Sequence, residues 1–474
     1  MAYLPQTEQE VKAMLATIGV QSIDELFAHL PSDVRFQGQL KIPPALSELE
    51  LTQHMEDLAQ RNVGTHQKVC FLGGGAYDHF IPAVVDFIAS RSEFYTSYTP
   101  YQPEVSQGNL QVFFEYQTLI TQLTGLDVSN ASLYDGATAL AEAVLMCLSH
   151  QTGRKRVIVP QNVHPEYRAV LATYLSHVSA EIITLATPRG IIDADSLARV
   201  VNDQTACVIL QQPNFFGCVE AARKISEITH AAGALLIAVV DPISLGVLRR
   251  PGDYGADIAV AEGQSLGLPL AWGGPYLGIL ACKEAFLRRL PGRLVGQTVD
   301  RRGQRCWVLT LQTREQHIRR EKATSNICTN QGLMALRATV YLAALGPHGL
   351  RAVAELCLQK AHYLRERLQR EAGFQPLFNA AFFKEFAVAA ESPAEVKTLL
   401  EIATDAGFFA GIPLGRWFPE LANALLIAVT EKRTQAEMDR LTAILASART
   451  RADSRAIDRK SSMTPSSQRT VQVE

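Results

Sequence analysis

Short apolar segments alternate with amphipathic ones between about residues 70 and 310, and this alternation constrains the fold more than any other feature. The β-branched, apolar runs at 156–161, 205–213 and 234–242 predict strands, and the segments between them have helical spacing. Strands that are apolar along their whole length are typical of a mostly parallel sheet covered by helices on both faces. The sequence therefore predicts an α/β fold with a ligand site beyond the C-terminal ends of the strands.

The pattern changes towards both ends of the chain, which divides it into four parts. We expect a helical arm over residues 1–60, a large domain over 61–320, a smaller α+β domain over 321–448 and a disordered tail over 449–474. The arm begins with a capping-box pattern at Thr7 and Glu10, and it is too short to fold alone. It would lie on the main body or on a partner. The tail has few apolar residues and no periodicity.

Composition excludes several classes of function. A formal net charge of -2 over 474 residues gives no basic field for nucleic acid or an anionic membrane. No apolar run reaches the roughly 18 residues of a membrane span, and the N-terminus does not resemble a signal peptide. The eight cysteines form no CxxC pair and the histidines show no ligand spacing, so we expect buried thiols, no metal site and a cytoplasmic location.

Two positions at predicted strand ends could bind a cofactor. Gly136, Ala137 and Thr138 open a helix within 134–144, where backbone N–H groups can bind a phosphate. The local residues by themselves favour the simpler alternative, a tight turn capped by Asp135. Asp241 ends the apolar run at 234–242. Its carboxylate could hold a proton on a cofactor's pyridine nitrogen, or it could cap the following turn.

Two polar loops are further candidates. The segment 95–109 carries Tyr95, Tyr98 and Tyr101, which favours a pocket or an interface over an ordinary surface loop. Thr324, Ser325 and Asn326 lie between the two predicted domains and could donate to a phosphate or carboxylate, or they could simply precede the helix that begins near Gly332. The Gly-rich segment 73–80 lacks the G-x-G-x-x-G spacing of a dinucleotide site.

Long stretches of the chain resemble the P-protein family, the glycine decarboxylase of the glycine cleavage system. The resemblance covers about residues 1–447 and includes FLGGGAYDHF, YTSYTPYQPEVSQGN, YDGATALAEA and REKATSNICTNQGLMAL. It implies an aspartate-aminotransferase-like fold, fold type I of the enzymes that use pyridoxal phosphate (PLP). The family occurs as one long chain or as two chains, and the second half or second chain carries a His-Lys pair before a Gly-rich loop ending in Gly-Gly-Pro.

Alignment on Gly-Gly-Pro places Gln264 where that family has the lysine that binds PLP covalently, and Gly263 where it has the histidine. No lysine occurs between Lys224 and Lys283, so a shift in the alignment does not supply one. A glutamine amide cannot form the imine. The resemblance thus implies the N-terminal subunit of the two-chain form, without a catalytic residue of its own.

The same resemblance implies roles for the candidate residues and for the partners. His164, Asp241 and residues 136–138 would be remnants of a cofactor site, and the loops at 98–108 and 323–331, the latter including Thr324, Ser325 and Asn326, would contribute to the partner's site. The expected assembly is an α2β2 heterotetramer in which the second subunit holds PLP, decarboxylates glycine and passes the aminomethyl group to the lipoyl arm of H-protein.

Two alternatives remain beside this interpretation. The chain could be a freestanding, non-catalytic regulator or scaffold of the same fold, or it could bind PLP without a covalent bond. The sequence also leaves open whether the vacated pocket is empty or filled by side chains such as Leu268 and Trp272.

Overall fold

The computed structural model describes residues 6–36, 38 and 40–462, which belong to two compact units, Met1–Val63 and Gly64–Glu474. The predicted boundary at residues 60 and 61 lies three residues before the observed one.

The first unit contains the helices α1 (Glu8–Ile18) and α2 (Glu48–Gln60). Thr7 and Glu10 form the predicted capping box at the start of α1, and Gly19 ends the helix in the left-handed conformation at φ 91°. The short helix expected near residue 24 is a single 3-10 turn, Asp24–Phe27. Leu15 is the one buried apolar side chain among the described residues of this unit.

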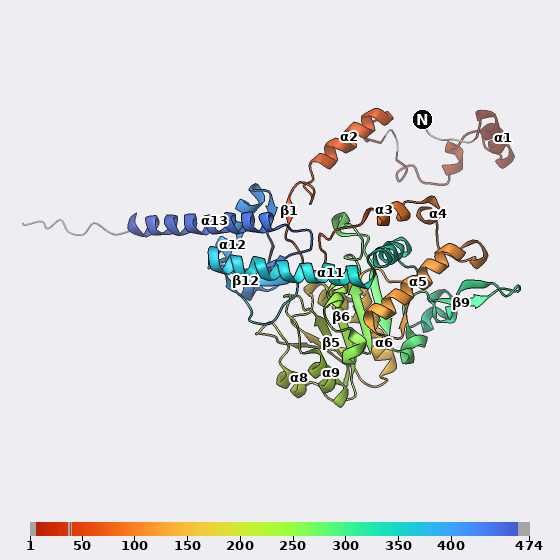
Figure 1. Ribbon diagram of the computed structural model, residues 1–474. Helices are drawn as coiled ribbons and strands as arrows, with labels where there is room; N and C mark the ends of the chain where they lie inside the picture. The colour runs from red at the N-terminus through yellow and green to blue at the C-terminus, as the bar shows by residue number, and fades with distance from the viewer. Residues whose placement is uncertain (1–5, 37, 39, 463–474) are drawn as a thin grey trace, which may run out of the picture. The chain divides into compact units, whose positions relative to one another are not determined.

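A seven-stranded, mostly parallel sheet forms the centre of the second unit, in the order β2–β8–β7–β6–β5–β3–β4 (Figure 1). The strands are β2 (Val128–Ser129), β3 (Arg156–Pro160), β4 (Glu181–Leu185), β5 (Thr205–Gln212), β6 (Leu235–Val240), β7 (Ile258–Glu262) and β8 (Gly278–Cys282). Strands β3 to β7 run parallel, and β8 is antiparallel to both neighbours. The predicted α/β fold is confirmed, and each strand predicted between residues 156 and 283 has its counterpart.

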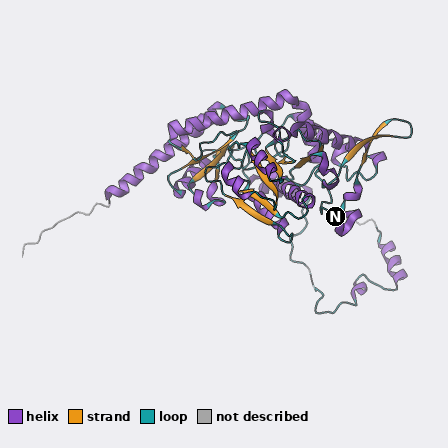
Figure 2. Cartoon of the chain, turned by 90° about the horizontal axis from the view of Figure 1, so that it is seen from below, coloured by secondary structure: helices purple, strands orange, loops and turns teal. Residues whose placement is uncertain are grey.

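Helices cover both faces of this sheet, because alternate side chains of each strand point to opposite sides. Ile209 and Ile237 pack in one apolar core with α6 (Gly136–His150) and α7 (Pro165–Leu175). Val208 and Leu236 pack in the other, with α5 (Gln107–Thr124), α8 (Ala194–Val200) and α9 (Ala222–Ala231). Figure 2 shows the strands enclosed between helices.

A smaller sheet lies towards the C-terminus, in the order β11–β12–β15–β14. Its strands are β11 (Gln375–Pro376), β12 (Glu385–Ala389), β14 (Ile412–Pro413) and β15 (Ala424–Ala428), and α12 (Pro393–Asp405) belongs to the same region. Strand β1 (Val69–Cys70) pairs with β13 (Phe408–Phe409), so a segment expected in the large domain extends into the small one.

The two long C-terminal helices differ in part from expectation. The helices predicted over 332–345 and 349–373 form one element, α11 (Gly332–Ala372), with a kink at Gly346 (φ 59°) before Pro347. Helix α13 spans Gln435–Ser462, so the expectation of disorder from residue 449 is wrong as far as Ser462. The segment 435–462 contains no Gly or Pro that would end a helix. Residues 463–474 lie outside the described residues.

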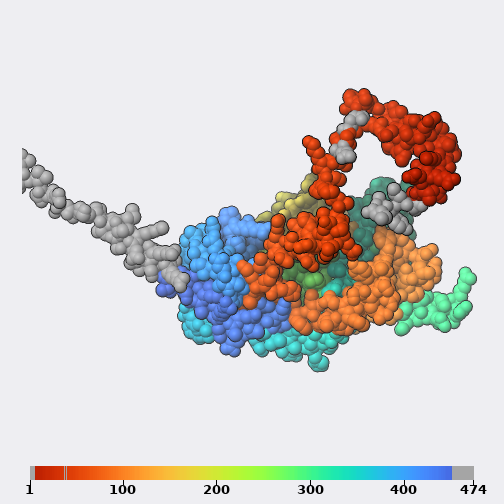
Figure 3. Space-filling view, turned by 90° about the horizontal axis from the view of Figure 1, so that it is seen from above, coloured from red at the N-terminus to blue at the C-terminus, as the bar shows by residue number. Residues whose placement is uncertain are grey.

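The strands β9 (Val295–Val299) and β10 (Arg305–Leu309) form a hairpin that projects from the second unit in all three views (Figures 1, 2 and 3). The short helices α3 (Ala83–Ala89), α4 (Ser92–Tyr95) and α10 (Gln316–Arg319) complete this unit. Within the described part of the chain, no helix combines the length and the apolar character needed to cross a membrane.

Candidate functional site

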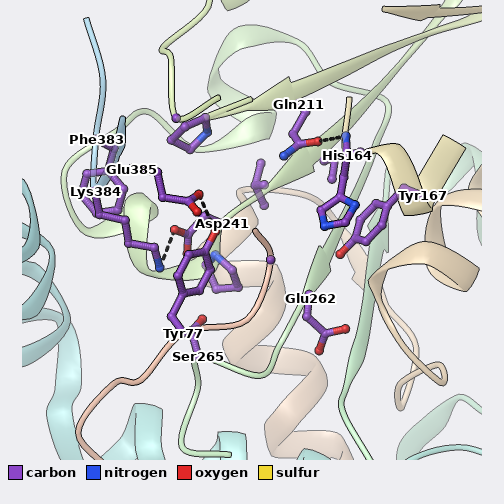
Figure 4. Close-up of a pocket in the computed structure, with 16 residues that line it drawn as sticks. Tyr77, His164, Tyr167, Gln211, Asp241, Glu262, Ser265, Phe383, Lys384 and Glu385 are labelled. Carbon is purple, nitrogen blue, oxygen red and sulfur yellow. Dashed lines mark hydrogen bonds and ion pairs between the residues drawn. The ribbon is translucent and has the colours of Figure 1, made fainter. Parts of the chain in front are cut away.

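A small cavity of about 40 Å³ lies beyond the C-terminal ends of β6 and β7, where an α/β sheet is expected to bind its ligand (Figure 4). The large domain contributes His164, Asp241 and Glu262 to its walls, and the small sheet contributes Lys384 and Glu385. The predicted residues His164 and Asp241 thus lie at one site, together with charged residues that the sequence patterns did not single out.

Asp241 directly follows β6 and forms an ion pair with Lys384, which directly precedes β12. The Nζ of Lys384 lies 2.8 Å from Oδ2 of Asp241 (Figure 4). Oδ1 accepts a hydrogen bond of 3.0 Å from the backbone N–H of Ile243. Asp241 therefore also caps the turn at Pro242–Gly246, as one interpretation of the sequence predicted. Both oxygens of this carboxylate are engaged by the chain itself.

Lys384 belongs to a larger buried network. Its Nζ donates to Nε2 of His79 over 3.0 Å and lies 3.5 Å from the centre of the Tyr77 ring. Nδ1 of His79 is 2.6 Å from a carboxylate oxygen of Glu431, so both ring nitrogens are engaged. Burial, reinforced by the charge of Lys384, lowers the pKa of His79. His79, Cys357 and Glu431 are close enough to share a metal ion, but these contacts describe an ion-pair network instead.

Glu385 holds the Gly-rich segment in place. Its side chain accepts hydrogen bonds of 2.7 Å from the backbone N–H of Gly74 and from the hydroxyl of Tyr77. Burial raises the pKa of Glu385 to about 7. The segment 73–80 is therefore a structural loop that closes one side of the cavity.

Glu262, the last residue of β7, lies against the N-terminus of α6. Its Oε2 accepts a 3.0 Å hydrogen bond from the N–H of Gly136, and its Oε1 accepts 3.0 Å bonds from the N–H groups of Gln264 and Leu277. Burial raises the pKa of Glu262 to about 7, against the lowering effect of these donors. At the helix terminus that could have bound a phosphate, the N–H of Gly136 is thus occupied by a side chain of the protein.

Thr138, at the same helix start, also has a partner within the chain. The N–H of Thr138 donates to Oδ1 of Asp135 over 2.8 Å in a capping box, as the simpler interpretation of the turn predicted. Ala137 lines a neighbouring cavity of about 480 Å³.

Gln264 is almost fully buried, at 2% exposure, and its amide bonds to the backbone on both sides. Oε1 accepts from the N–H of Tyr77 over 2.8 Å, and Nε2 donates to the carbonyl oxygens of Tyr77 (3.1 Å) and Leu268 (2.9 Å). The residue at the position of the family's lysine therefore joins two loops. Leu268 is buried nearby, whereas Trp272 is 78% exposed and does not line the small cavity.

His164 begins α7 and stacks on an aromatic ring of this chain. Its ring lies 4.7 Å from that of Tyr167 at an interplanar angle of 24°, and Nε2 is 2.6 Å from the carbonyl oxygen of Gly74. Burial lowers the pKa of His164. Tyr167 therefore covers one face of the imidazole ring.

The loop at 324–326 lies apart from this cavity. Thr324 and Ser325 line a small separate cavity with Arg288 and Arg314, and Asn326 accepts a hydrogen bond from Gln316. The structure therefore does not bring these three residues together with Asp241 and His164.

Three residues that the patterns missed, Glu262, Lys384 and Glu385, determine the character of the site. Each is a charged residue at the end of an otherwise apolar strand, and this was the available signal. PLP does not fit the residues present: the imine-forming lysine is missing, and the groups that would bind its ring and phosphate already have partners in the chain.

The mostly parallel sheet, its flanking helices and the position of the cavity are those of fold type I, the fold of many PLP-dependent enzymes. A structure of mouse CSAD shares this fold with a TM-score of 0.66 at 14% identity, covering 94% of this chain and 92% of that one.

Residues 1–445 match the family Glycine cleavage system P-protein, and the chain belongs to that family. Probable glycine dehydrogenase (decarboxylating) subunit 1 of Carboxydothermus hydrogenoformans is 52% identical over 445 residues, 94% of this chain and 99% of that protein. The corresponding protein of Desulforamulus reducens is 52% identical over 447 residues, with the same coverage. A crystal structure of glycine decarboxylase (P-protein) of the glycine cleavage system, in inhibitor-bound form, superposes with a TM-score of 0.85 at 47% identity, covering 94% of this chain and 100% of that one.

Proposed function

We propose that this chain is the first of two subunits of a cytoplasmic glycine dehydrogenase (decarboxylating) and that it carries out no chemistry alone. The second subunit holds PLP and decarboxylates glycine, and the aminomethyl group passes to the lipoyl arm of H-protein. Two copies of each subunit form the α2β2 assembly. The observation that carries this proposal is Gln264, an amide bonded to the backbone where PLP chemistry needs a free lysine.

An exposed aromatic surface supports the pairing. Tyr95, Tyr98 and Tyr101 are 68%, 88% and 64% exposed, although large aromatic side chains are usually buried in a monomer. Tyr95 and Tyr98 border a cavity of about 200 Å³ that Asn330 also lines. Figure 3 shows the surrounding residues of α4 and α5, in orange, at the molecular surface. Because tyrosines are enriched at protein interfaces, we assign this surface to the second subunit.

The proposal predicts that exchange of label between bicarbonate and glycine, in the presence of H-protein, requires both chains. Neither purified chain should support exchange, and mixing should restore it. Tyr98→Ala should raise the concentration of this chain needed for half-maximal exchange about tenfold or more, because a central interface aromatic contributes about 2 kcal/mol or more. Val178→Ala, which truncates an exposed apolar side chain three residues after the end of α7, is the matched control.

Exchange by this chain alone would contradict the proposal. Failure of the two chains to associate at all would favour a freestanding regulator or scaffold. PLP absorbance retained by this chain after dialysis would favour binding of the cofactor without a covalent bond.

A further inference from the structure

The cavity beyond β6 and β7 contains the three kinds of group that a phosphorylated pyridine cofactor requires. A helix N-terminus can bind a phosphate, a carboxylate can pair with a protonated ring nitrogen, and one side chain can provide the covalent bond. These groups are the start of α6, Asp241 and position 264. Each of them has a partner from this chain.

At the phosphate end, the partner is Glu262. Its carboxylate accepts hydrogen bonds from the backbone N–H groups of Gly136, Gln264 and Leu277. Backbone N–H groups of this kind are the donors that bind the oxygens of a phosphate group. On the side of Tyr167 there is little space, because a single carbon atom added at Gly136 would lie 2.2 Å from the Tyr167 hydroxyl.

The larger neighbouring cavity does not offer an alternative place for a phosphate. Asp135, Glu166 and Glu262 line it, and its described lining includes no lysine or arginine. The carboxylates of Asp135 and Glu166 would repel a phosphate dianion, since like charges at short range are unfavourable.

At the ring end, the partner is Lys384. Its ammonium group is 2% exposed, pairs with Asp241 at 2.8 Å and lies over the Tyr77 ring. A protonated ring nitrogen that paired with the same oxygen of Asp241 would displace the ammonium group of Lys384. Among the described ion pairs of Lys384, no second carboxylate is present to take the place of Asp241. The free space is about 40 Å³, enough for about three water molecules at roughly 10–15 Å³ each.

We infer that the site is self-occupied: Glu262 replaces the cofactor's phosphate, Lys384 replaces its ring nitrogen, and Gln264 replaces the covalent bond with hydrogen bonds. The chain thereby retains, without a cofactor, the contacts that join the large domain to the small sheet. Restoring a lysine at position 264 is consequently insufficient to restore PLP binding, because two further side chains close the site.

The test compares Q264K with the triple variant Q264K/E262S/K384M. Each full-length chain is incubated with PLP and reduced with borohydride, and the peptide containing position 264 is examined by mass spectrometry. We expect at least tenfold more adduct in the triple variant than in Q264K. Equal labelling of the two, or stoichiometric PLP on the wild-type chain after dialysis, would overturn the inference.

A second measurement decides the matter if the triple variant does not fold. The melting temperatures of K384M and E262Q are compared with that of K397M, which removes an exposed ammonium group 3.9 Å from Glu401. We expect both site variants to melt clearly below K397M, because Asp241 and the N-terminus of α6 lose their partners. Shifts no larger than that of K397M would show that these side chains do not replace a ligand. Neither measurement involves the second subunit, so the outcome is separable from the proposed pairing.

Discussion

Glu142 shows how a single buried carboxyl makes stability depend on pH. It lies within α6 at 3% exposure, and burial raises its pKa to about 7 although a hydrogen bond from Ser325 acts in the opposite direction. The folded chain therefore binds this proton more tightly than the unfolded chain. The resulting stabilisation is fully present below about pH 4.5 and is lost as the pH rises through 7.

Glu142→Gln should remove this dependence, because an amide keeps the shape and does not titrate. One pKa unit corresponds to about 1.4 kcal/mol, so the free energy of unfolding of the wild type should fall by about 2–3 kcal/mol relative to the variant between pH 5 and 8.5. Thermal melts of both proteins across this range measure the difference, and other titrating groups cancel. Glu227→Gln, at an exposed position on α9, is the control. A gap between Glu142→Gln and wild type that does not change with pH would refute the prediction.

Among the elements, α6 depends on its N-terminal cap. Asp135 accepts the N–H of Thr138, and most of the helix is buried against the central sheet. Asp135→Ala should cost about 1–2 kcal/mol and lower the melting temperature by a few degrees. Thr7→Ala removes an equivalent capping box from α1, in the other unit, and should leave the main unfolding transition unchanged. Similar shifts for the two variants, measured by calorimetry, would contradict this view of α6.

The elements were more predictable from the sequence than the site. Strands such as β5 and β6 are apolar along their length, so their positions follow from local pattern alone. The pairing of Asp241 with Lys384 joins residues far apart in the chain, and a local pattern cannot reveal such a contact. The importance of Gln264 could be predicted because the resembling family has a lysine at that position. No such expectation existed for Glu262, two residues earlier, so its role was missed.

At the scale of the whole molecule, the unit Met1–Val63 exposes several large apolar side chains. Phe36, Leu40, Ile42 and Leu49 are 65%, 67%, 71% and 79% exposed, so four large apolar side chains within fourteen residues of the sequence lack a covering surface in this chain. Burial of one such side chain contributes about 1.5–3 kcal/mol, so a partner that covered several would bind this unit strongly. We expect the second subunit to cover them.

The double variant Phe36→Ser, Ile42→Ser tests that expectation. The melting temperature of the isolated chain should not change, because these side chains are already exposed to water. The dissociation constant for the second subunit should rise at least tenfold, since a loss of about 1.4 kcal/mol already has that effect. Sedimentation or titration calorimetry of the mixed chains measures it, with Val178→Ser on the second unit as the control. Unchanged affinity, or a drop in the melting temperature of the isolated chain, would show that this apolar surface serves the chain's own fold.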